Sequence, residues 1–143
     1  MKSYLQKSFP PALRSCWIKL NAEFKKRLLK VGLTPDQYSV LRWIEEADED
    51  RLCQGELAKL MFTDANNISE LVKRMEVMKL LVRTSAATDR RKKLLKISSK
   101  GVNLLRLSKP IAKALEEEIL ANLDRDEKER LLSMLRCVCQ KLN

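Results

Sequence analysis

The residues of this chain that could do chemistry are mostly cationic, and they are concentrated in one short stretch. The 143 residues carry a formal net charge of +10. Residues 79–100 contribute +7 of it, from eight basic residues against the single acid Asp89. An ordinary solvated surface scatters its charge, whereas a binding site for a polyanion concentrates it. The stretch therefore predicts a polyanion-binding site, although a lysine-rich loop in solvent would have a similar composition.

Residue types that serve catalysis or metal binding are scarce in this sequence. The chain contains no histidine, which excludes His-dependent acid–base catalysis and His-ligated metal sites. The sequence also shows no phosphate-binding loop and no nucleophile–base pair at a meaningful spacing. We therefore expect neither an enzyme nor a bound cofactor or metal ion.

Redox chemistry could come from four cysteines: Cys16, Cys53, Cys137 and Cys139. Residues 1–11 lack the continuous apolar segment of a secretory signal, and no apolar run is long enough to cross a membrane. We therefore expect a cytoplasmic protein with reduced thiols and no membrane partner. Cys16 lies on an apolar helical stripe, where a free cysteine is commonly a small buried hydrophobe. Cys137 and Cys139 point about 200° apart on one helix, which disfavours a shared metal ion or a disulfide.

Apolar residues at helical spacing predict four helices before the basic stretch. They begin near residues 10, 34, 54 and 65, and the first and the last of them extend to about residues 31 and 78. Thr34 and Gln37 form a capping box for the second helix, and Asp64 supplies an N-cap for the fourth. Cys53 stands where Ser or Thr would cap the third. The third and fourth helices form a helix-turn-helix candidate.

The period of the sequence changes after the fourth helix. Residues 80–84 and 94–97 are short and rich in branched side chains, which predicts two strands around a charged tip at 86–93. A long helix from Ser99 to about Leu123 follows, and a last helix opens near Asp124. A hairpin directly after a helix-turn-helix is a wing. We predict a mainly α fold with a small β-hairpin wing, that is, a winged helix-turn-helix.

This order of elements resembles the MarR family of bacterial transcriptional regulators. The resemblance rests on five segments: Leu57–Ala58, Leu71–Glu76, Leu80–Arg83, Asp89–Arg91 and Ile97–Gly101. It implies a single domain over 1–143, with a winged helix-turn-helix lobe at about 34–98 and dimerisation helices at about 10–31 and 99–143. It further implies a homodimer whose helices 65–78 enter DNA major grooves while the wings reach the neighbouring minor grooves. Such regulators are usually repressors released by small phenolic or amphipathic ligands or by thiol oxidation.

Two positions depart from the family pattern. The family usually has glycine before the first strand, where this chain has Lys79. Either the turn differs, or a non-glycine residue adopts a left-handed conformation at a cost of about 1 kcal/mol or more. The family also often has arginine at the position of Glu70. A carboxylate there would repel phosphate or accept a hydrogen bond from a cytosine amine, so the target sequence is affected more than DNA binding itself.

The candidate DNA contacts lie on helix 65–78 and on the wing. Asn66 and Asn67 lie in the first turn of the helix, where an asparagine can pair with adenine, although both could equally be solvated polar residues. Further contacts with phosphate would position the protein without specifying sequence, and an arginine fits a narrow minor groove. Asp89 is expected to orient a neighbouring arginine. The full set is Ala65, Asn66, Asn67, Ser69, Glu70, Lys73, Arg83, Asp89, Arg90, Arg91 and Lys92.

Three aromatic residues could line a pocket for a small aromatic or amphipathic effector, although aromatic residues at helical spacing are more often core: Trp17, Tyr38 and Trp43. The leading hypothesis is a homodimeric repressor of double-stranded DNA that binds a pseudo-palindromic operator and is released by such an effector. One alternative is a winged-helix protein-interaction module with an acidic partner. The other is a thiol-based redox-sensing regulator of the same family.

Overall fold

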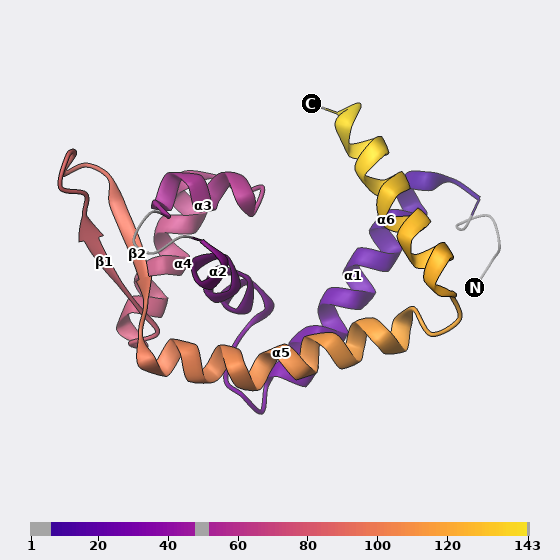
Figure 1. Cartoon of the computed structure of the whole chain (residues 1–143), viewed down its shortest axis with the longest axis horizontal. Coiled ribbons are helices and arrows are strands. Elements are labelled where there is room, and N and C mark those ends of the chain that lie inside the picture. The colour runs from indigo at the N-terminus through magenta and orange to yellow at the C-terminus, as the bar shows by residue number, and fades with distance from the viewer. Residues whose placement is uncertain (1–6, 48–51, 143) are drawn as a thin grey trace. The chain divides into compact units, whose positions relative to one another are not determined.

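The computed structural model describes residues 7–47 and 52–142, and these residues form six helices and one β-hairpin. In chain order the elements are α1 (Phe9–Leu28), α2 (Pro35–Glu46), α3 (Gln54–Leu60), α4 (Ala65–Val77), β1 (Leu81–Ser85), β2 (Lys93–Ile97), α5 (Ser99–Ile119) and α6 (Arg125–Gln140) (Figure 1). The expected fold class, mainly α with a small hairpin wing, is confirmed.

The chain divides into two compact units, residues 1–109 and residues 110–143. The boundary lies within α5, directly before Pro110. The first unit contains the helix-turn-helix and the wing, and the second contains the end of α5 and all of α6. A single domain over the whole chain remains a prediction.

The starts of three helices are fixed by side-chain caps. Thr34 Oγ1 accepts from the backbone N–H of Gln37 at 3.1 Å, and Gln37 Oε1 accepts from the Thr34 N–H at 3.0 Å. Asp64 Oδ1 accepts from the N–H of Asn67 at 2.8 Å. Asp124 and Glu127 form a second reciprocal box at the start of α6. Each cap satisfies N–H groups that a helix start leaves without partners. The predicted caps of α2 and α4 are confirmed, and Cys53 makes no side-chain cap bond for α3.

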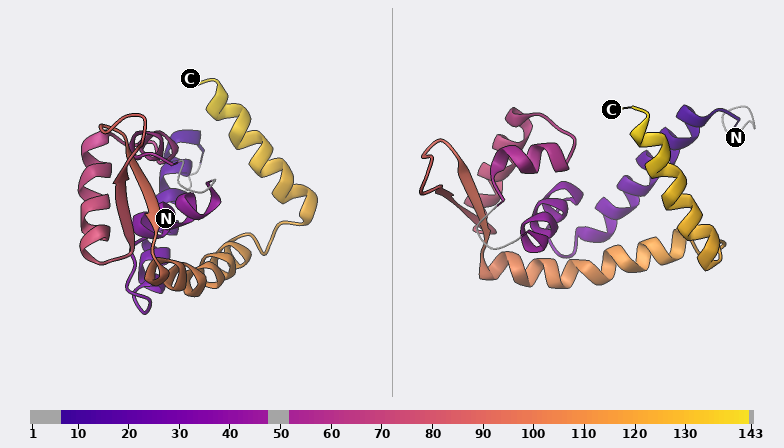
Figure 2. Two further views of the ribbon diagram at one scale, coloured as in Figure 1. Left: turned by 60° about the vertical axis from the view of Figure 1, so that its left-hand side comes forward. Right: turned by 45° about the horizontal axis from the view of Figure 1, so that its top comes forward.

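The wing is a two-stranded antiparallel hairpin. Its register pairs Leu81 with Ile97 at the base and Ser85 with Lys93 near the tip. A short segment before α3 extends the hairpin, because Leu52 O accepts from the N–H of Leu95 at 2.9 Å and Cys53 bridges to Leu94. In Figure 2, α4 packs beside the hairpin, which the contacts between α4 and β1 confirm. The hairpin is therefore held by the helix-turn-helix and by the strand-like segment together.

The core of the first unit is contributed mainly by α2, α3, α4 and the wing, with fully buried Leu28 from α1 and Leu105 from α5. Leu41, Leu57 and Val72 have no exposed surface, and Ile68, Leu80 and Leu81 have at most 1%. Of α1, only Leu28 is buried. In α2, α3 and α4 the face that the apolar spacing defines is buried, which leaves the polar face of α4 in solvent. Among the described helices, none combines the length and the apolar character needed to span a membrane.

Candidate nucleic-acid interface

The recognition helix α4 displays a polar face to solvent. Ala65, Asn66, Asn67, Glu70 and Lys73 are exposed, and Ser69 is half-buried. The opposite face is buried through Ile68, Val72 and Met75. Because apolar residues recur every three or four positions, the polar residues between them must share the outer face. The structure thus brings together the six candidates that the sequence placed on this helix.

The two asparagines at the start of α4 differ in their bonding. Asn67 Nδ2 donates to Thr63 Oγ1 and to Asp64 Oδ2, both at 3.2 Å. Both N–H groups of its side-chain amide can therefore be engaged in the cap, which leaves Oδ1 for another partner. Asn66 is exposed and makes no side-chain hydrogen bond with another described residue. The geometry therefore makes Asn66 the freer of the two for contact with a base edge.

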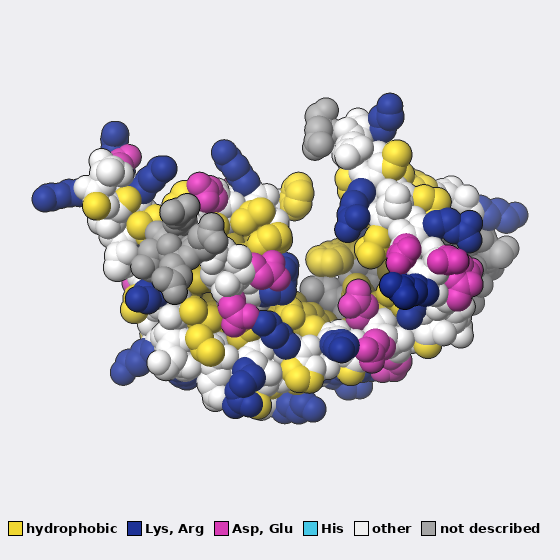
Figure 3. Space-filling view, in the orientation of Figure 1, with side chains coloured by type: hydrophobic (Ala, Val, Ile, Leu, Met, Phe, Trp, Pro, Cys, Tyr) yellow, Lys and Arg dark blue, Asp and Glu magenta, His cyan; other side chains and the backbone are white. Residues whose placement is uncertain are grey.

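The wing carries the densest positive charge of the described surface. Arg90, Arg91, Lys92 and Lys93 are all exposed around the hairpin tip, and Figure 3 shows the Lys and Arg side chains projecting there. Asp89 Oδ1 accepts from the N–H of Arg91 at 2.9 Å and lies 3.5 Å from its Nε. The side chain of Arg91 is 95% exposed. The acid thus orients one arginine while leaving its charge available to a polyanion.

Arg83 lies in a different environment from the other candidate cations. Its guanidinium donates to Glu76 Oε1 through Nε at 3.2 Å and through Nη2 at 2.9 Å. The Arg83 side chain is only 22% exposed, and its hydrogen bond holds the pKa of Glu76 below the ordinary value of 4.5. Arg83 is thus paired within the lobe, unlike the arginines at the wing tip, and its contact with phosphate stays a prediction.

The turn after α4 is a helix end with a left-handed, non-glycine residue. Lys79 has φ 62°, its N–H donates to Glu76 O, and the N–H of Leu80 donates to Met75 O at 2.9 Å. These bonds are the pattern of a glycine-type helix end, so the turn keeps its form and Lys79 adopts the strained conformation. Phe62, after α3, has φ 52° in the same position. The sequence did not anticipate this second strained residue.

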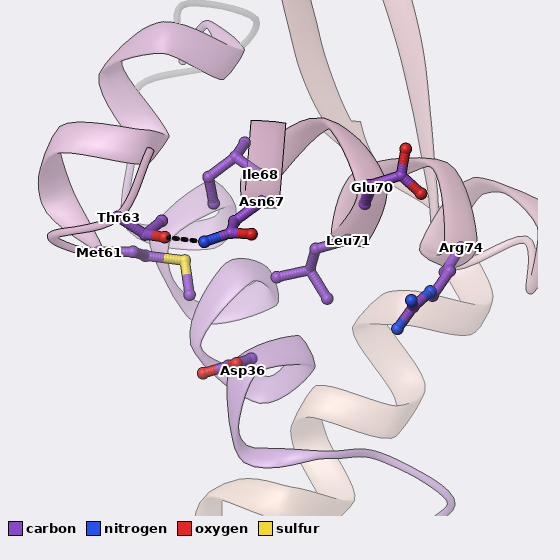
Figure 4. A pocket seen from close by; sticks show the side chains of 8 residues that line it. All are labelled: Asp36, Met61, Thr63, Asn67, Ile68, Glu70, Leu71 and Arg74. Carbon is purple, nitrogen blue, oxygen red and sulfur yellow. Dashed lines mark hydrogen bonds between the residues drawn. The ribbon is translucent and has the colours of Figure 1, made fainter. Parts of the chain in front are cut away.

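Two cavities border the recognition helix. One of about 280 Å³ lies between α2 and α4 (Figure 4) and is lined by Asp36, Met61, Thr63, Asn67, Ile68, Glu70, Leu71 and Arg74. The other, of about 350 Å³, lies between the wing and the starts of α3 and α4, with Cys53, Gln54, Gly55, Ala65, Arg91, Lys92 and Lys93 around it. Most of these residues were not predicted as site residues from the sequence, because the cavities arise from contacts between separate elements.

The three candidate effector residues are dispersed among different environments. Tyr38 is buried, with its ring edge-on to Phe24 at 5.1 Å between centroids. Trp43 is half-buried beneath the guanidinium of Arg42, at 4.5 Å. Trp17 is 63% exposed. None of the three lines either cavity described above, and the packing of Tyr38 is that of a core residue.

The cysteines differ from expectation at one position. Cys16 is exposed, whereas its place on an apolar stripe predicted burial. The reason is that most of the α1 stripe is uncovered within a single chain. Cys53 is buried, and Cys137 and Cys139 are exposed. Within residues 7–47 and 52–142, no cluster of three potential metal-ligating side chains occurs.

Comparison with known proteins places this arrangement among DNA-binding regulators. The sequence model of the MarR family matches residues 31–92. The transcriptional regulator HosA of Escherichia coli is 30% identical over 104 residues, which are 73% of this chain and 76% of HosA. The transcriptional repressor CouR, solved on a 23-mer DNA duplex, is 28% identical with a TM-score of 0.87, and the match covers 97% of this chain and 98% of that one. CouR from Rhodococcus jostii RHA1 bound to p-coumaroyl-CoA is 24% identical with a TM-score of 0.81, covering 96% and 93%.

Proposed function

The chain belongs to the MarR family of transcriptional regulators, and from this premise we propose that it is a cytoplasmic, homodimeric repressor of double-stranded DNA. The main support for this proposal is that the winged helix-turn-helix lobe displays two kinds of surface suited to DNA. The exposed polar face of α4 suits the edges of bases, and the exposed arginines Arg90 and Arg91 suit a narrow minor groove. A repressor built in this way reads sequence with the helix and gains affinity from the wing.

Sequence reading is assigned to the first turns of α4. Asn66 can pair with adenine, and Glu70 can accept from a cytosine amine. Ser69, Lys73 and Lys92 hold phosphates, which fixes the register. Two copies of α4 in a symmetric dimer read half-sites about 10 bp apart, so the operator is pseudo-palindromic.

Dimer formation is supported by apolar side chains that a single chain leaves in solvent. On α1 these are Phe9, Leu13, Trp17 and Ile18, each at least 46% exposed. On α6, Leu132, Met134 and Val138 are at least 40% exposed, and no residue of the helix is buried. Monomeric proteins usually cover the apolar face of a helix against other elements. A second copy of the chain would cover both stripes.

Release from DNA is assigned to a small aromatic or amphipathic effector. CouR, bound to p-coumaroyl-CoA in one structure, has a ligand that joins an aromatic acyl group to a polar nucleotide. Trp17, Tyr38 and Trp43 stay our candidates for the aromatic contacts. The effector would act by favouring a dimer state in which the two recognition helices no longer fit successive grooves.

Thiol oxidation is a second candidate for release, because Cys16, Cys137 and Cys139 are exposed in the single chain. Peroxide should then free the wild-type protein from DNA. The same treatment of a Cys16→Ser variant distinguishes the cysteines: unchanged release assigns the response to α6, and lost release assigns it to α1. Insensitivity of the wild-type protein to peroxide would leave the effector as the means of release.

Fluorescence anisotropy with a random duplex, titrated at rising salt, tests the DNA-binding surface. The logarithm of the binding constant should fall with log[salt] by about 0.9 per phosphate contacted. Arg91→Ala should flatten that slope, while Arg125→Ala, which removes a 92% exposed cation from α6, should leave it unchanged. Absence of binding at low salt would contradict the proposal and favour the protein-interaction module.

The promoter of the chain's own gene, used as bait, tests sequence reading. Asn66→Ala should lower the ratio of operator to random-duplex affinity, since one bidentate base contact contributes about 1–3 kcal/mol of discrimination. Asn67→Ala serves as the comparison, because its amide is engaged in the helix cap. Equal losses on both duplexes would reduce Asn66 to a positioning role.

A further inference from the structure

The last turn of the recognition helix is joined to the first strand of the wing by one ion pair. Glu76 lies on α4 and Arg83 on β1. The carboxylate atom Oε1 accepts two hydrogen bonds from the planar guanidinium, at 3.2 and 2.9 Å. The side chain of Arg83 is 22% exposed and that of Glu76 is 38% exposed, so both partners are partly shielded from water. Two bonds to one planar group restrict rotation as well as distance.

The segment that follows the wing holds the same end of the recognition helix. Ser98 Oγ donates to Lys79 O at 2.6 Å, and Lys100 Nζ donates to Met78 O at 2.9 Å. The backbone N–H of Ser98 also donates to Leu80 O at 3.0 Å. Both ends of the hairpin are therefore bonded to the end of α4. We call Glu76, Arg83, Ser98 and Lys100 the wing-base clamp.

The backbone beneath the wing-base clamp is packed too closely to shift. A Cβ atom at Gly101 would lie 2.2 Å from Leu80 O, so the first turn of α5 touches the turn after α4. Lys79 stays in its left-handed conformation, which persists only where surrounding contacts over-determine it. The clamp thus has a rigid base on the α5 side and a side-chain pair on the β1 side.

We propose that Glu76 and Arg83 are positioning residues that fix the angle between the wing and the recognition helix. With that angle fixed, the wing arginines and the polar face of α4 meet adjacent grooves of one duplex without a further loss of conformational entropy. Arg83 acts through Glu76 and makes no phosphate contact. The inference rests on the proposed function, since it assigns a role within DNA binding.

Simple electrostatics and the clamp predict opposite results for one substitution. Glu76→Ala makes the protein more positive by one charge, and it frees Arg83 from its partner. If charge alone set affinity, the variant would bind a random duplex more tightly. If the clamp positions the wing, the variant binds about fivefold more weakly. This factor corresponds to the usual net free energy of one hydrogen bond. Alanine is a good helix former, so α4 itself should persist.

A matched control and a second variant complete the experiment. Glu56→Ala removes the same charge from an exposed position on α3 that makes no ion pair with another described residue, and it should bind as tightly as wild type or slightly more so. Arg83→Lys keeps the net charge but cannot form the two-bond fork. A phosphate-binding residue would tolerate this change, whereas the clamp predicts a loss similar to that of Glu76→Ala.

A double-mutant cycle between Glu76 and the wing tip distinguishes a positioning role from a general structural defect. In a background that lacks both wing arginines, Arg90→Ala with Arg91→Ala, the wing no longer enters the minor groove, so Glu76→Ala should cost less than twofold in affinity there. Circular dichroism confirms that each variant is folded. Tighter or unchanged binding by Glu76→Ala, or an equal loss in both backgrounds, would overturn the clamp. A wild-type protein that binds no DNA would instead overturn the proposed function, and the clamp's role with it.

Discussion

The winged lobe and the terminal helices use the same apolar spacing with opposite results. In the lobe, the apolar positions of α2, α3 and α4 are buried, and Leu41, Leu57 and Val72 have no exposed surface. In α6 the spacing is equally regular, yet no residue is buried, and α1 buries only Leu28. Periodicity therefore identifies the apolar face of a helix but does not identify what covers it. The lobe completes its core within one chain, whereas the apolar faces of α1 and α6 are left largely exposed.

The largest expected effect follows from breaking the lobe's core. Leu41→Ala should lower the free energy of unfolding by about 2–5 kcal/mol, because a fully buried leucine leaves a cavity. Urea denaturation measures this change. The matched substitution on a terminal helix, Leu132→Ala, removes a side chain that is 50% exposed. An equal loss for Leu132→Ala at every protein concentration would show that the two regions do not differ.

The next effect concerns the stripe of α6. Val138→Asp should weaken the dimer at least about tenfold, because it removes an apolar contact of about 1.5–3 kcal/mol and introduces a charge. Analytical ultracentrifugation measures the dissociation constant. Ser133→Asp is the control, since 100° per residue places Ser133 about 140° around the helix from Val138. A dimer weakened equally by both variants would refute the assignment of this stripe to the interface.

A gain in stability is expected at the strained turn. Lys79→Gly should raise the free energy of unfolding by about 1 kcal/mol, because glycine adopts a φ of 62° without steric cost. Lys73→Gly, within the exposed face of α4, should lower it by a similar amount. Thermal denaturation of the two variants compares them directly. If both variants lower the free energy of unfolding, the side chain of Lys79 stabilises the fold by more than its left-handed backbone destabilises it.

The smallest effect is the pH dependence of the Glu76–Arg83 pair. Arg83 lowers the pKa of Glu76 in the folded protein, so the pair stabilises the fold above the unfolded pKa, and this stabilisation is lost as the pH falls through the folded pKa. The carboxylate is partly exposed and screened. The free energy of unfolding of the wild type should therefore exceed that of Glu76→Ala by under about 1 kcal/mol at neutral pH. Urea denaturation from pH 7 to pH 3 should show the difference vanishing, and a constant difference would argue against a role for the ionised carboxylate.

Local chemistry allowed much of the fold to be predicted. The caps at Thr34 and Asp64 and the hairpin depend on residues close in sequence, and the family comparison points to the same fold. The candidates on α4 shared one face because helical geometry requires it. Their roles as DNA contacts remain predictions.

Features that depend on distant contacts could not be predicted. From the sequence, Arg83 could not be distinguished from the other cations of the basic stretch. Its pairing with Glu76 depends on how a strand packs against a helix. The bridge between Cys53 and Leu94 joins segments about 40 residues apart, and no local pattern encodes it. The exposure of Cys16 follows from the missing cover over α1.

Gly101 shows how a residue without chemistry can restrict substitution. The carbonyl oxygen of Leu80 lies only 2.2 Å from the place where the Cβ atom of any side chain at position 101 would be. A library randomised at this position should therefore retain glycine almost alone, although the residue belongs to neither the DNA-binding candidates nor the apolar core. In this chain we therefore expect intolerance to substitution to arise from the distance between two backbone segments as well as from recognition.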